Sequence, residues 1–391
     1  MSNVRLVAPC LFGLEKAVGE EIDALGYHRR DTIDGRVYFE GPPSAIVRSN
    51  LWLRCAERVL IEMASFEAKS FTALFDGVKK IPWERFIGKN DAFPVKGHSI
   101  KSELHSLPDC QKIVKKAIVE RLKEAYGVEW FEESGVKYQI EFFILNDRAV
   151  IMIDTTGVPL HKRGYRTEAN LAPIRETLAA AMVKIARPRE DVLLWDPFCG
   201  SGTIPIEAAL IMTNTAPGLF RRFAAEGFPW LPKKLWEDAR EEAKAARKLD
   251  TPFRALATDI DPDTVEIARD NIRRAGMWAY IDCFKKDALT IRRDERRTTI
   301  VCNPPYGERM DSVKSAQALY KKMGKVFLQL SPWQIYIITS EEDFEALYGK
   351  RADKVRRLYN GMIRCNFYQY FKRDDRAGVK KSDTHEKTEN R

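Results

Sequence analysis

The sequence predicts an α/β protein whose C-terminal half is a doubly wound domain, preceded by two small α+β domains. Two observations support this prediction. Between about residues 171 and 375, short apolar segments typical of buried strands alternate with helical segments. The first 65 residues instead show a β-α-β-β-α-β order, which is the ferredoxin-like pattern. At 391 residues and 45% hydrophobic content, the chain is long enough for two or three domains.

Residues 1–65 supply the ferredoxin-like order. The expected elements are a strand over 4–8, a helix over 13–25, a hairpin around Asp34-Gly35, a helix over 43–51 and a strand over 58–64. No residue of this segment suggests catalysis. We therefore expect a domain that supports or positions the remainder of the chain.

Residues 66–160 are expected to form the second α+β domain. Its expected elements are a strand over 92–100, a helix over 108–126, and a hairpin made of 137–145 and 149–154. Three lysines of the helix, Lys112, Lys115 and Lys116, lie outside its apolar stripe. They are candidates for contact with an RNA backbone, and an ordinary solvated helix face explains them equally well.

A basic connector, His-Lys-Arg-Gly-Tyr-Arg, follows at residues 161–166. Arg163 and Arg166, with Tyr165 between them, have the chemistry that contacts phosphates and stacks on a base. A solvated linker is the alternative interpretation. We keep both arginines as candidate RNA contacts.

A strand, a glycine turn and a helix succeed one another at residues 191–210. The strand ends at Asp196-Pro197-Phe198-Cys199-Gly200-Ser201-Gly202, and a helix resumes at Thr203. In this arrangement the backbone approaches a cofactor closely and the first helical N–H groups face it. Gly200 and Gly202 leave space that a side chain would fill. The motif is shorter than the G-x-G-x-x-G of dinucleotide sites, so alone it identifies no cofactor.

Acidic residues follow the next two expected strands. Asp259 ends the strand over 254–258, where doubly wound folds place an acid that accepts hydrogen bonds from ribose hydroxyls. It lies well beyond the usual ~20 residues after the glycines, because residues 217–250 read as a helical insertion. Asp287 closes a third strand that begins at Ile281. A carboxylate there can accept a hydrogen bond from an adenine amine.

The fourth strand end is Asn303-Pro304-Pro305-Tyr306. Residues 299–302 form a short apolar strand, and two consecutive prolines then leave the backbone little freedom. Such a turn can hold an amide, backbone carbonyls and an aromatic face in one arrangement, which suits a planar base with an exocyclic amine. A stiff surface turn is the alternative. We favour a site because this turn is the fourth of four strand ends with matching chemistry.

Composition limits the class of protein. Lys+Arg 65 against Asp+Glu 56 gives a net charge of +9 and a pI near 9.0, which favours a polyanionic partner. The seven cysteines are scattered, with no C-x-x-C pair, so we expect no disulfide and no metal site. No run approaches the ~18 apolar residues of a membrane span. We therefore expect a soluble cytoplasmic protein without a membrane partner.

The four strand ends resemble the successive motifs of the class I S-adenosylmethionine-dependent methyltransferases. This resemblance covers residues 171–375 and implies a Rossmann-like, seven-stranded mixed sheet that binds S-adenosyl-L-methionine. The preceding half, with Ala92-Phe93-Pro94-Val95-Lys96 and the strand over 149–154, resembles a THUMP RNA-binding domain behind a ferredoxin-like companion. The whole chain is similar to the THUMP-containing RNA guanine-N2 methyltransferases, closest to the bacterial enzymes acting on large-subunit ribosomal RNA.

The resemblance also implies roles for residues of the four motifs. The Asn303 side-chain oxygen and the Pro304 carbonyl would accept the hydrogens of the amine, and Tyr306 would stack on the base. Arg309 would help to hold the target nucleotide or its phosphate. The cofactor would be bound by Asp196 at its methionine end, by Phe198, Gly200 and Gly202, by Asp259 at the ribose, and by Asp287 at the adenine.

The same resemblance implies a domain division. A ferredoxin-like domain is expected over 1–65, a THUMP domain over 66–160 and the methyltransferase domain over 161–375. Residues 376–391 are charged and lack apolar periodicity, so we expect a flexible tail.

Other functions use similar residues. The chain could act on guanine-N2 in tRNA, or be a non-catalytic RNA-binding or ribosome-assembly factor on a methyltransferase fold. Enzymes that methylate adenine N6 in DNA or a glutamine amide in protein use the same turn, but a THUMP-like half implies RNA. Cys199 and Cys302 lie in the motifs and suggest nucleophilic catalysis, yet neither has a histidine beside it in sequence. We interpret both as small buried residues.

Overall fold

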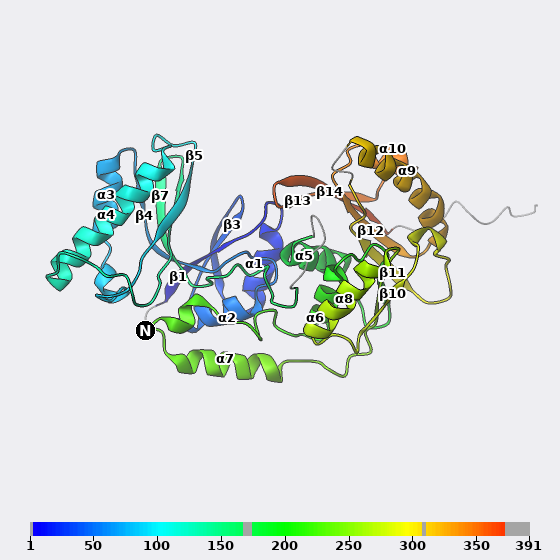
Figure 1. Cartoon of the computed structure of the whole chain (residues 1–391), viewed down its shortest axis with the longest axis horizontal. Coiled ribbons are helices and arrows are strands. Elements are labelled where there is room, and N and C mark those ends of the chain that lie inside the picture. Colours follow the sequence, from blue (N-terminus) through cyan, green and yellow to red (C-terminus); the bar gives the residue numbers. More distant parts are fainter. Residues whose placement is uncertain (1–2, 167–173, 307–309, 372–391) are drawn as a thin grey trace, which may run out of the picture.

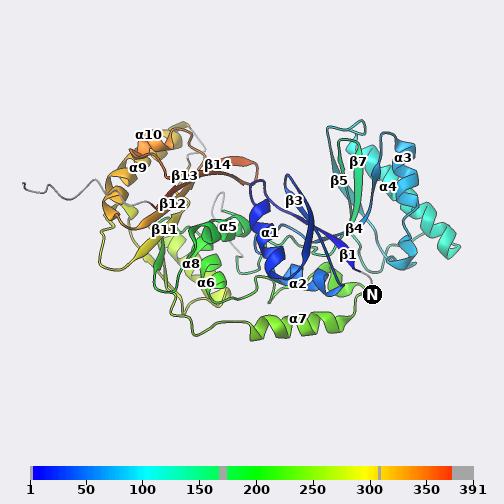
Figure 2. The same cartoon turned by 180° about the vertical axis from the view of Figure 1, so that it is seen from behind.

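Two seven-stranded sheets lie at opposite ends of the long axis of the molecule, as Figures 1 and 2 show from the two sides. The computed structural model describes residues 3–166, 174–306 and 310–371. The predicted fold class is confirmed: both sheets are mixed, and helices pack against them. Arg309 and the expected tail at 376–391 lie outside the described residues.

The N-terminal sheet has the strand order β2-β3-β1-β4-β7-β6-β5. The elements of this half are β1 (Val4–Pro9), α1 (Glu15–Ala24), β2 (His28–Ile33), β3 (Arg36–Gly41), α2 (Ser44–Trp52), β4 (Leu60–Glu67), α3 (Phe71–Lys79), the short 3₁₀ helix η1 (Trp83–Arg85), β5 (Val95–Ile100), α4 (Leu107–Tyr126), β6 (Ile140–Leu145) and β7 (Arg148–Asp154). Elements β1 to β4 follow the predicted β-α-β-β-α-β order.

Strand β4 joins the two small domains into one sheet. It pairs antiparallel with β1 on one side and with β7 on the other. The boundary expected at residues 65/66 therefore falls inside β4, because the strand continues to Glu67 to complete its pairing with β7. The hairpin of β6 and β7 turns at Asn146 and Asp147, whose φ angles of 48° and 61° suit a tight hairpin turn.

The C-terminal sheet has the order β10-β9-β8-β11-β12-β14-β13. The elements are α5 (Glu176–Ala186), β8 (Leu193–Asp196), α6 (Thr203–Met212), η2 (Ala224–Gly227), α7 (Lys233–Ala245), β9 (Ala255–Asp259), α8 (Pro262–Arg274), β10 (Ile281–Lys285), η3 (Ala288–Thr290), β11 (Thr298–Cys302), α9 (Met310–Phe327), η4 (Leu328–Leu330), β12 (Gln334–Thr339), α10 (Phe344–Tyr348), β13 (Lys354–Asn360) and β14 (Ile363–Tyr370). Strands β8 to β12 are parallel, so their carboxyl ends share one edge. Strand β14 runs antiparallel to β12.

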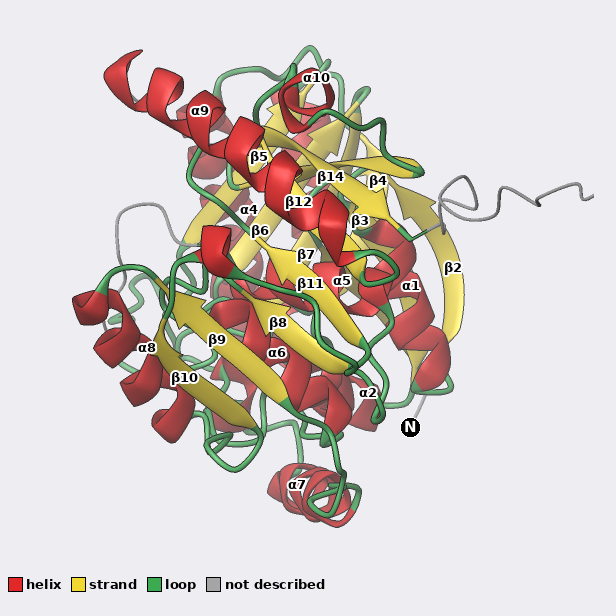
Figure 3. Cartoon of the chain, turned by 90° about the vertical axis from the view of Figure 1, so that its right-hand side faces the viewer, coloured by secondary structure: helices red, strands yellow, loops and turns green. Residues whose placement is uncertain are grey.

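Both faces of this sheet are buried, because successive side chains of its central strands pack into cores on opposite sides. Ile300 and Cys302 of β11 pack with Tyr320 of α9, whereas Val301 joins the larger core that includes α5 and α6. Successive side chains of a strand point to opposite faces, so a uniformly apolar strand is buried on both. Figure 3 shows the twisted sheet with α9 crossing in front of it.

The insertion at 217–250 connects the two halves. Its helix α7 lies beside α2 in Figures 1 and 2, where two guanidinium nitrogens of Arg48 donate to Glu242 at 3.0 and 2.7 Å. Across the same junction, the Arg54 guanidinium donates to the Thr215 carbonyl at 2.9 Å. The insertion thus fastens the C-terminal half to the ferredoxin-like elements, a role that its sequence did not indicate.

Candidate active site

The glycine turn connects the carboxyl end of β8 to the start of α6. Gly200 and Gly202 have φ angles of 52° and 80°, a region that side chains disfavour. A Cβ atom built on Gly200 would meet nothing within 4 Å, so open space lies beside it. Asp196 is 1% exposed and accepts a hydrogen bond from the Phe198 N–H at 3.1 Å. Burial raises the pKa of the Asp196 carboxyl well above its ordinary value.

Asp259 ties this turn to the neighbouring strand. Its two carboxylate oxygens accept hydrogen bonds from the backbone N–H groups of Gly200 and Asp261, each at 3.1 Å. Because β8 and β9 are parallel neighbours, the two acids end at the same edge of the sheet. Asp259 therefore fixes the glycine backbone, and its remaining lone pairs stay available to a ligand.

Between Asp259 and Asp261 lies an apolar residue that was not among the predicted site residues. Ile260 is 61% exposed directly after β9. An exposed isoleucine enclosed by two acids at a strand end was the signal that could have found it. Asp287, by contrast, accepts the Leu289 N–H at 2.8 Å and so caps the 3₁₀ helix η3. The carboxylate of Asp287 thus has a local structural role, and its contact with adenine stays a prediction.

The Asn303 turn leaves the fully buried strand β11. Tyr320 of α9 supports it from the side: its hydroxyl donates to the Pro305 carbonyl at 2.7 Å and lies 2.9 Å from the Thr339 hydroxyl. Burial raises the pKa of Tyr320 to about 12, so this donor keeps its proton at neutral pH. Tyr320 was not identified from the sequence, where it reads as an ordinary apolar position of a helix.

Tyr306 folds back onto Asn303. Its hydroxyl donates to the Asn303 side-chain oxygen, and the ring is half-buried against the core. Burial raises the pKa of the Tyr306 hydroxyl well above its ordinary value, so it remains a neutral donor. An amide oxygen accepts two hydrogen bonds, so Asn303 retains one acceptor position for a substrate amine. The stacking role of Tyr306 stays a prediction.

The two cysteines of the motifs are buried, as predicted. Cys199 is 5% exposed and Cys302 is 0% exposed, and neither is in a disulfide. A hydrogen bond with the Cys283 thiol and burial raise the pKa of the Cys199 thiol, and burial raises that of Cys302. Since the thiolate is the nucleophilic form, both environments argue against nucleophilic catalysis by these residues.

The basic connector is not the surface that we expected. Arg163 is 7% exposed, and its guanidinium donates to the Glu207 carboxylate at 3.3 Å. The prediction that Arg163 contacts RNA directly is therefore wrong, because the side chain is buried. A basic residue in an irregular connector is normally exposed to solvent, so the sequence predicted a surface position. Here the side chain instead forms an ion pair with a carboxylate buried on α6. Arg166 is half-buried and pairs with Glu176 at 3.0 Å.

The lysines of α4 differ in their availability. Lys115 is half-buried, donating to Glu133 at 2.5 Å and lying 3.5 Å from the centre of the Phe93 ring. Lys112 and Lys116 are exposed. Lys112 also lies 3.7 Å from Asp109 in an exposed ion pair. Of the three predicted lysines, Lys112 and Lys116 remain candidates for RNA contact.

The described residues contain neither a candidate metal site nor a membrane-spanning helix. Within residues 3–166, 174–306 and 310–371, no group of histidine, cysteine and acidic side chains has an arrangement that could hold a metal ion. None of the helices over those same ranges combines the length and apolarity of a bilayer span.

Comparison with known proteins identifies the family. The model described as "RMKL-like, methyltransferase domain" matches residues 163–369, more than half of the 391-residue chain. The chain belongs to the RMKL-like methyltransferase family. Further models match the N-terminal half: an RlmL ferredoxin-like domain at residues 5–60 and a THUMP domain at residues 68–154.

Two curated relatives of this methyltransferase differ in length. YpsC of Bacillus subtilis (strain 168), named as a candidate RNA methyltransferase, is 46% identical, with 95% of this chain and 97% of that protein covered. The Ribosomal RNA large subunit methyltransferase K/L of Methylococcus capsulatus is 35% identical, with 92% of this chain and 50% of that protein covered. This chain thus spans about half the length of the K/L relative.

Solved structures match along almost the whole chain. SMU.472, a candidate methyltransferase complexed with SAH, is 40% identical with a TM-score of 0.88, and 95% of this chain and 98% of that chain are covered. A predicted N6-adenine-specific DNA methylase from Listeria monocytogenes is 44% identical with a TM-score of 0.89, at 95% and 96% coverage. The fold of this methyltransferase is therefore that of the family.

Proposed function

We propose that this methyltransferase transfers the methyl group of S-adenosyl-L-methionine to the exocyclic N2 amine of a guanine in large-subunit ribosomal RNA. The observation that carries the proposal is the Asn303 turn, which leaves β11 directly beside the strand that ends in Asp196 and the glycine turn. An amide fixed next to a cofactor site is what an amine substrate requires.

The residues at the edge of the sheet fit this cofactor. The open space beside Gly200 and the positive φ of both glycines suit a ligand held close to the backbone. Asp196 would face the ammonium group of the methionine end, Asp259 the ribose hydroxyls and Asp287 the adenine amine. Exposed Ile260 would supply an apolar contact for the adenine ring. When bound, the cofactor would supply an electrophilic methyl carbon: its bond to the sulfonium sulfur breaks as its bond to the amine nitrogen forms, S-adenosylhomocysteine leaves, and the methylated amine releases a proton to water.

The Asn303 turn would prepare the amine for that displacement. The lone pair of an exocyclic amine is delocalised into its ring, so the amine is a weak nucleophile. Accepting its hydrogens on the Asn303 oxygen and the Pro304 carbonyl would localise the lone pair and aim it at the methyl carbon. Tyr306 and Tyr320 hold this turn through the hydrogen bonds at Asn303 and Pro305. These bonds preorganise the acceptors before the substrate arrives.

The N-terminal half supports an RNA substrate. It matches a THUMP domain, and the sequence carries a net charge of +9. Ribosomal RNA is favoured by the K/L relative, although that longer protein includes a half that this chain does not cover. Transfer RNA remains the alternative RNA. DNA adenine is the second candidate, because the Listeria neighbour carries that description and the Asn303 turn also suits an adenine amine.

Labelled methyl transfer to separate polymers tests the substrate class. The protein would be incubated with labelled S-adenosylmethionine and with undermodified ribosomal RNA, undermodified tRNA or unmethylated DNA. We expect incorporation into large-subunit ribosomal RNA above the other two. Incorporation of label into DNA alone would contradict the proposal of an RNA substrate. Incorporation into tRNA alone would show that tRNA, and not ribosomal RNA, is the substrate.

Asp259→Ala is expected to weaken cofactor binding about 10- to 100-fold. The change removes an ionised acceptor for ribose, worth about 1.5–3 kcal/mol, and releases the Gly200 N–H. Calorimetric titration with S-adenosylhomocysteine measures it. Asp263→Ala, which removes an exposed acid from the first turn of α8, is the matched control and should bind normally. Equal affinities for both variants would remove Asp259 from the proposed site.

A further inference from the structure

A cavity of about 550 Å³ opens at the edge of the C-terminal sheet opposite to the Asn303 turn. It is lined by Thr298 and Gln334, the first residues of β11 and β12, and by Val192, which precedes β8. The carboxyl ends of the same strands carry the candidate active site. At ~3.3 Å per residue, five-residue β11 separates the two edges by roughly 15 Å.

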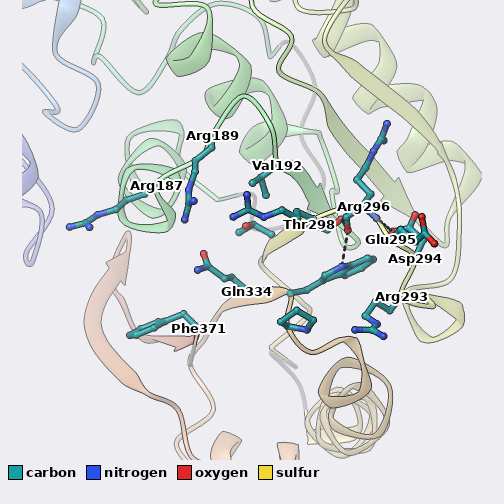
Figure 4. A pocket seen from close by; sticks show the side chains of 14 residues that line it. Arg187, Arg189, Val192, Arg293, Asp294, Glu295, Arg296, Thr298, Gln334 and Phe371 are labelled. Atoms are coloured by element: carbon teal, nitrogen blue, oxygen red, sulfur yellow. Dashed lines mark hydrogen bonds between the residues drawn. The ribbon is translucent and has the colours of Figure 1, made fainter. Parts of the chain in front are cut away.

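Five arginines gather around this cavity. They come from two separate segments of the chain and are Arg187, Arg189, Arg293, Arg296 and Arg297. All five are exposed, whereas Thr298, Thr299 and Trp333 form a buried floor. Figure 4 shows Arg187 and Arg189 on the α5 side and Arg293 across the cavity from them, with Arg189 directed toward Gln334.

Nearby acids do not neutralise the arginines. Only Asp294 and Glu295 line the cavity with negative charge, against five arginines. Arg297 pairs with Asp191 outside the lining, at 2.7 Å. Across the described ranges, neither Arg187 nor Arg189 has an ion-pair partner. The cavity therefore keeps a net positive charge that a bound anion could neutralise.

We infer that this arginine cavity binds the phosphate backbone of the RNA substrate, as a second contact on the catalytic domain. The inference rests on the proposed function, because it assumes an RNA substrate. Guanidinium groups form paired hydrogen bonds with phosphate, which makes arginine the residue of choice for it. The cavity thus anchors the RNA at the edge of the sheet remote from the methyl-transfer site.

The form of the cavity favours a polymer over a small anion. Small-molecule sites enclose most of their ligand and are largely apolar, whereas these arginines stand on an exposed rim. Their spread over two segments suits several successive phosphates. Phe371, 39% exposed on the same rim, offers a ring on which an unpaired base could stack.

The double variant Arg187→Gln/Arg189→Gln tests the inference. Lys244→Gln/Lys248→Gln, which removes two exposed charges at and just after the end of α7, is the matched control. Binding of a ribosomal RNA transcript would be measured by fluorescence anisotropy over a series of salt concentrations. We expect the arginine variant to bind about 5- to 30-fold more weakly at low salt. A plot of the logarithm of the association constant against the logarithm of the salt concentration has a negative slope. Its magnitude should become smaller by ~0.7 for each RNA phosphate that the variant no longer neutralises.

Two further readouts separate the outcomes. Unchanged binding of S-adenosylhomocysteine by both variants shows that the active site is intact. An arginine variant whose RNA affinity and salt slope equal those of the wild type would overturn the inference. If that variant binds inorganic tripolyphosphate more weakly but RNA normally, the cavity is a site for small anions and the inference is also overturned. Methyl transfer by the wild-type protein to the same transcript tests the proposed function separately, so its absence would be distinguished from a failure of the arginine site.

Discussion

Asn303→Ala is expected to lower the rate of methyl transfer at least about 100-fold while cofactor affinity stays within about twofold. In the proposed mechanism the amide oxygen positions the substrate amine, so its loss would remove an interaction needed only as the amine attacks. The proposed cofactor residues lie on β8 and β9 or in the turns after β8, β9 and β10, so they remain in place. Single-turnover transfer with saturating enzyme isolates this step from RNA binding and product release.

Asn366→Ala is the matched control for this prediction. Asn366 is a half-buried asparagine of the same domain, and its side chain donates to the Tyr368 hydroxyl at 3.3 Å and to no residue of the turn at 303–306. Its transfer rate should stay within about threefold of the wild type. An Asn303→Ala protein that is as active as the Asn366→Ala protein would remove Asn303 from the mechanism.

Glu207→Ala is expected to destabilise the fold by about 3–5 kcal/mol, because it leaves a buried arginine without its counter-ion. Glu207 is 0% exposed on α6, where it accepts hydrogen bonds from the Arg163 guanidinium at 3.3 Å and the Tyr165 hydroxyl at 3.1 Å. The Arg163 guanidinium also donates to the Leu160 and Arg54 carbonyls. The cluster therefore holds the connector between the RNA-binding half and the catalytic half.

Urea unfolding followed by tryptophan fluorescence measures this effect. Glu242→Ala, which breaks the exposed pair with Arg48, is the control and should cost at most about 1 kcal/mol. The double variant Arg163→Met/Glu207→Leu should recover much of the loss, because both charges leave the interior together. A Glu207→Ala protein as stable as the Glu242→Ala protein would show that the buried pair does not hold the connector.

Much of the candidate site could be predicted because it lies at strand ends. Buried parallel strands contain few charged or amide side chains, so the first such residue at the carboxyl end of each strand marks the edge of the sheet. Asp196, Asp259 and Asn303 follow this rule. Their convergence then follows from the parallel order of β9, β8 and β11. Local pattern and fold agree at these positions.

The contacts between distant segments could not be predicted. Arg163 looked like a surface residue, since its buried partner lies 44 positions along the chain. Glu207 itself was the available signal, because it is a lone charge in the otherwise apolar helix α6. Likewise, the pairing of β4 with β7 joins two apparent domains into one sheet, and the sequence of β4 does not indicate that it pairs with a second strand. The supporting hydrogen bond of Tyr320 depends on how α9 packs, which its own periodicity does not specify.

Nucleoside analysis of the methylated product tests the central claim most directly. Large-subunit ribosomal RNA without its own modifications would be methylated by the wild-type protein, digested to nucleosides and resolved by liquid chromatography and mass spectrometry. We expect N2-methylguanosine that is present with the wild type and absent with Asn303→Ala. Label found only in N6-methyladenosine, or in no nucleoside of the ribosomal RNA, would contradict the assignment of this methyltransferase to guanine N2.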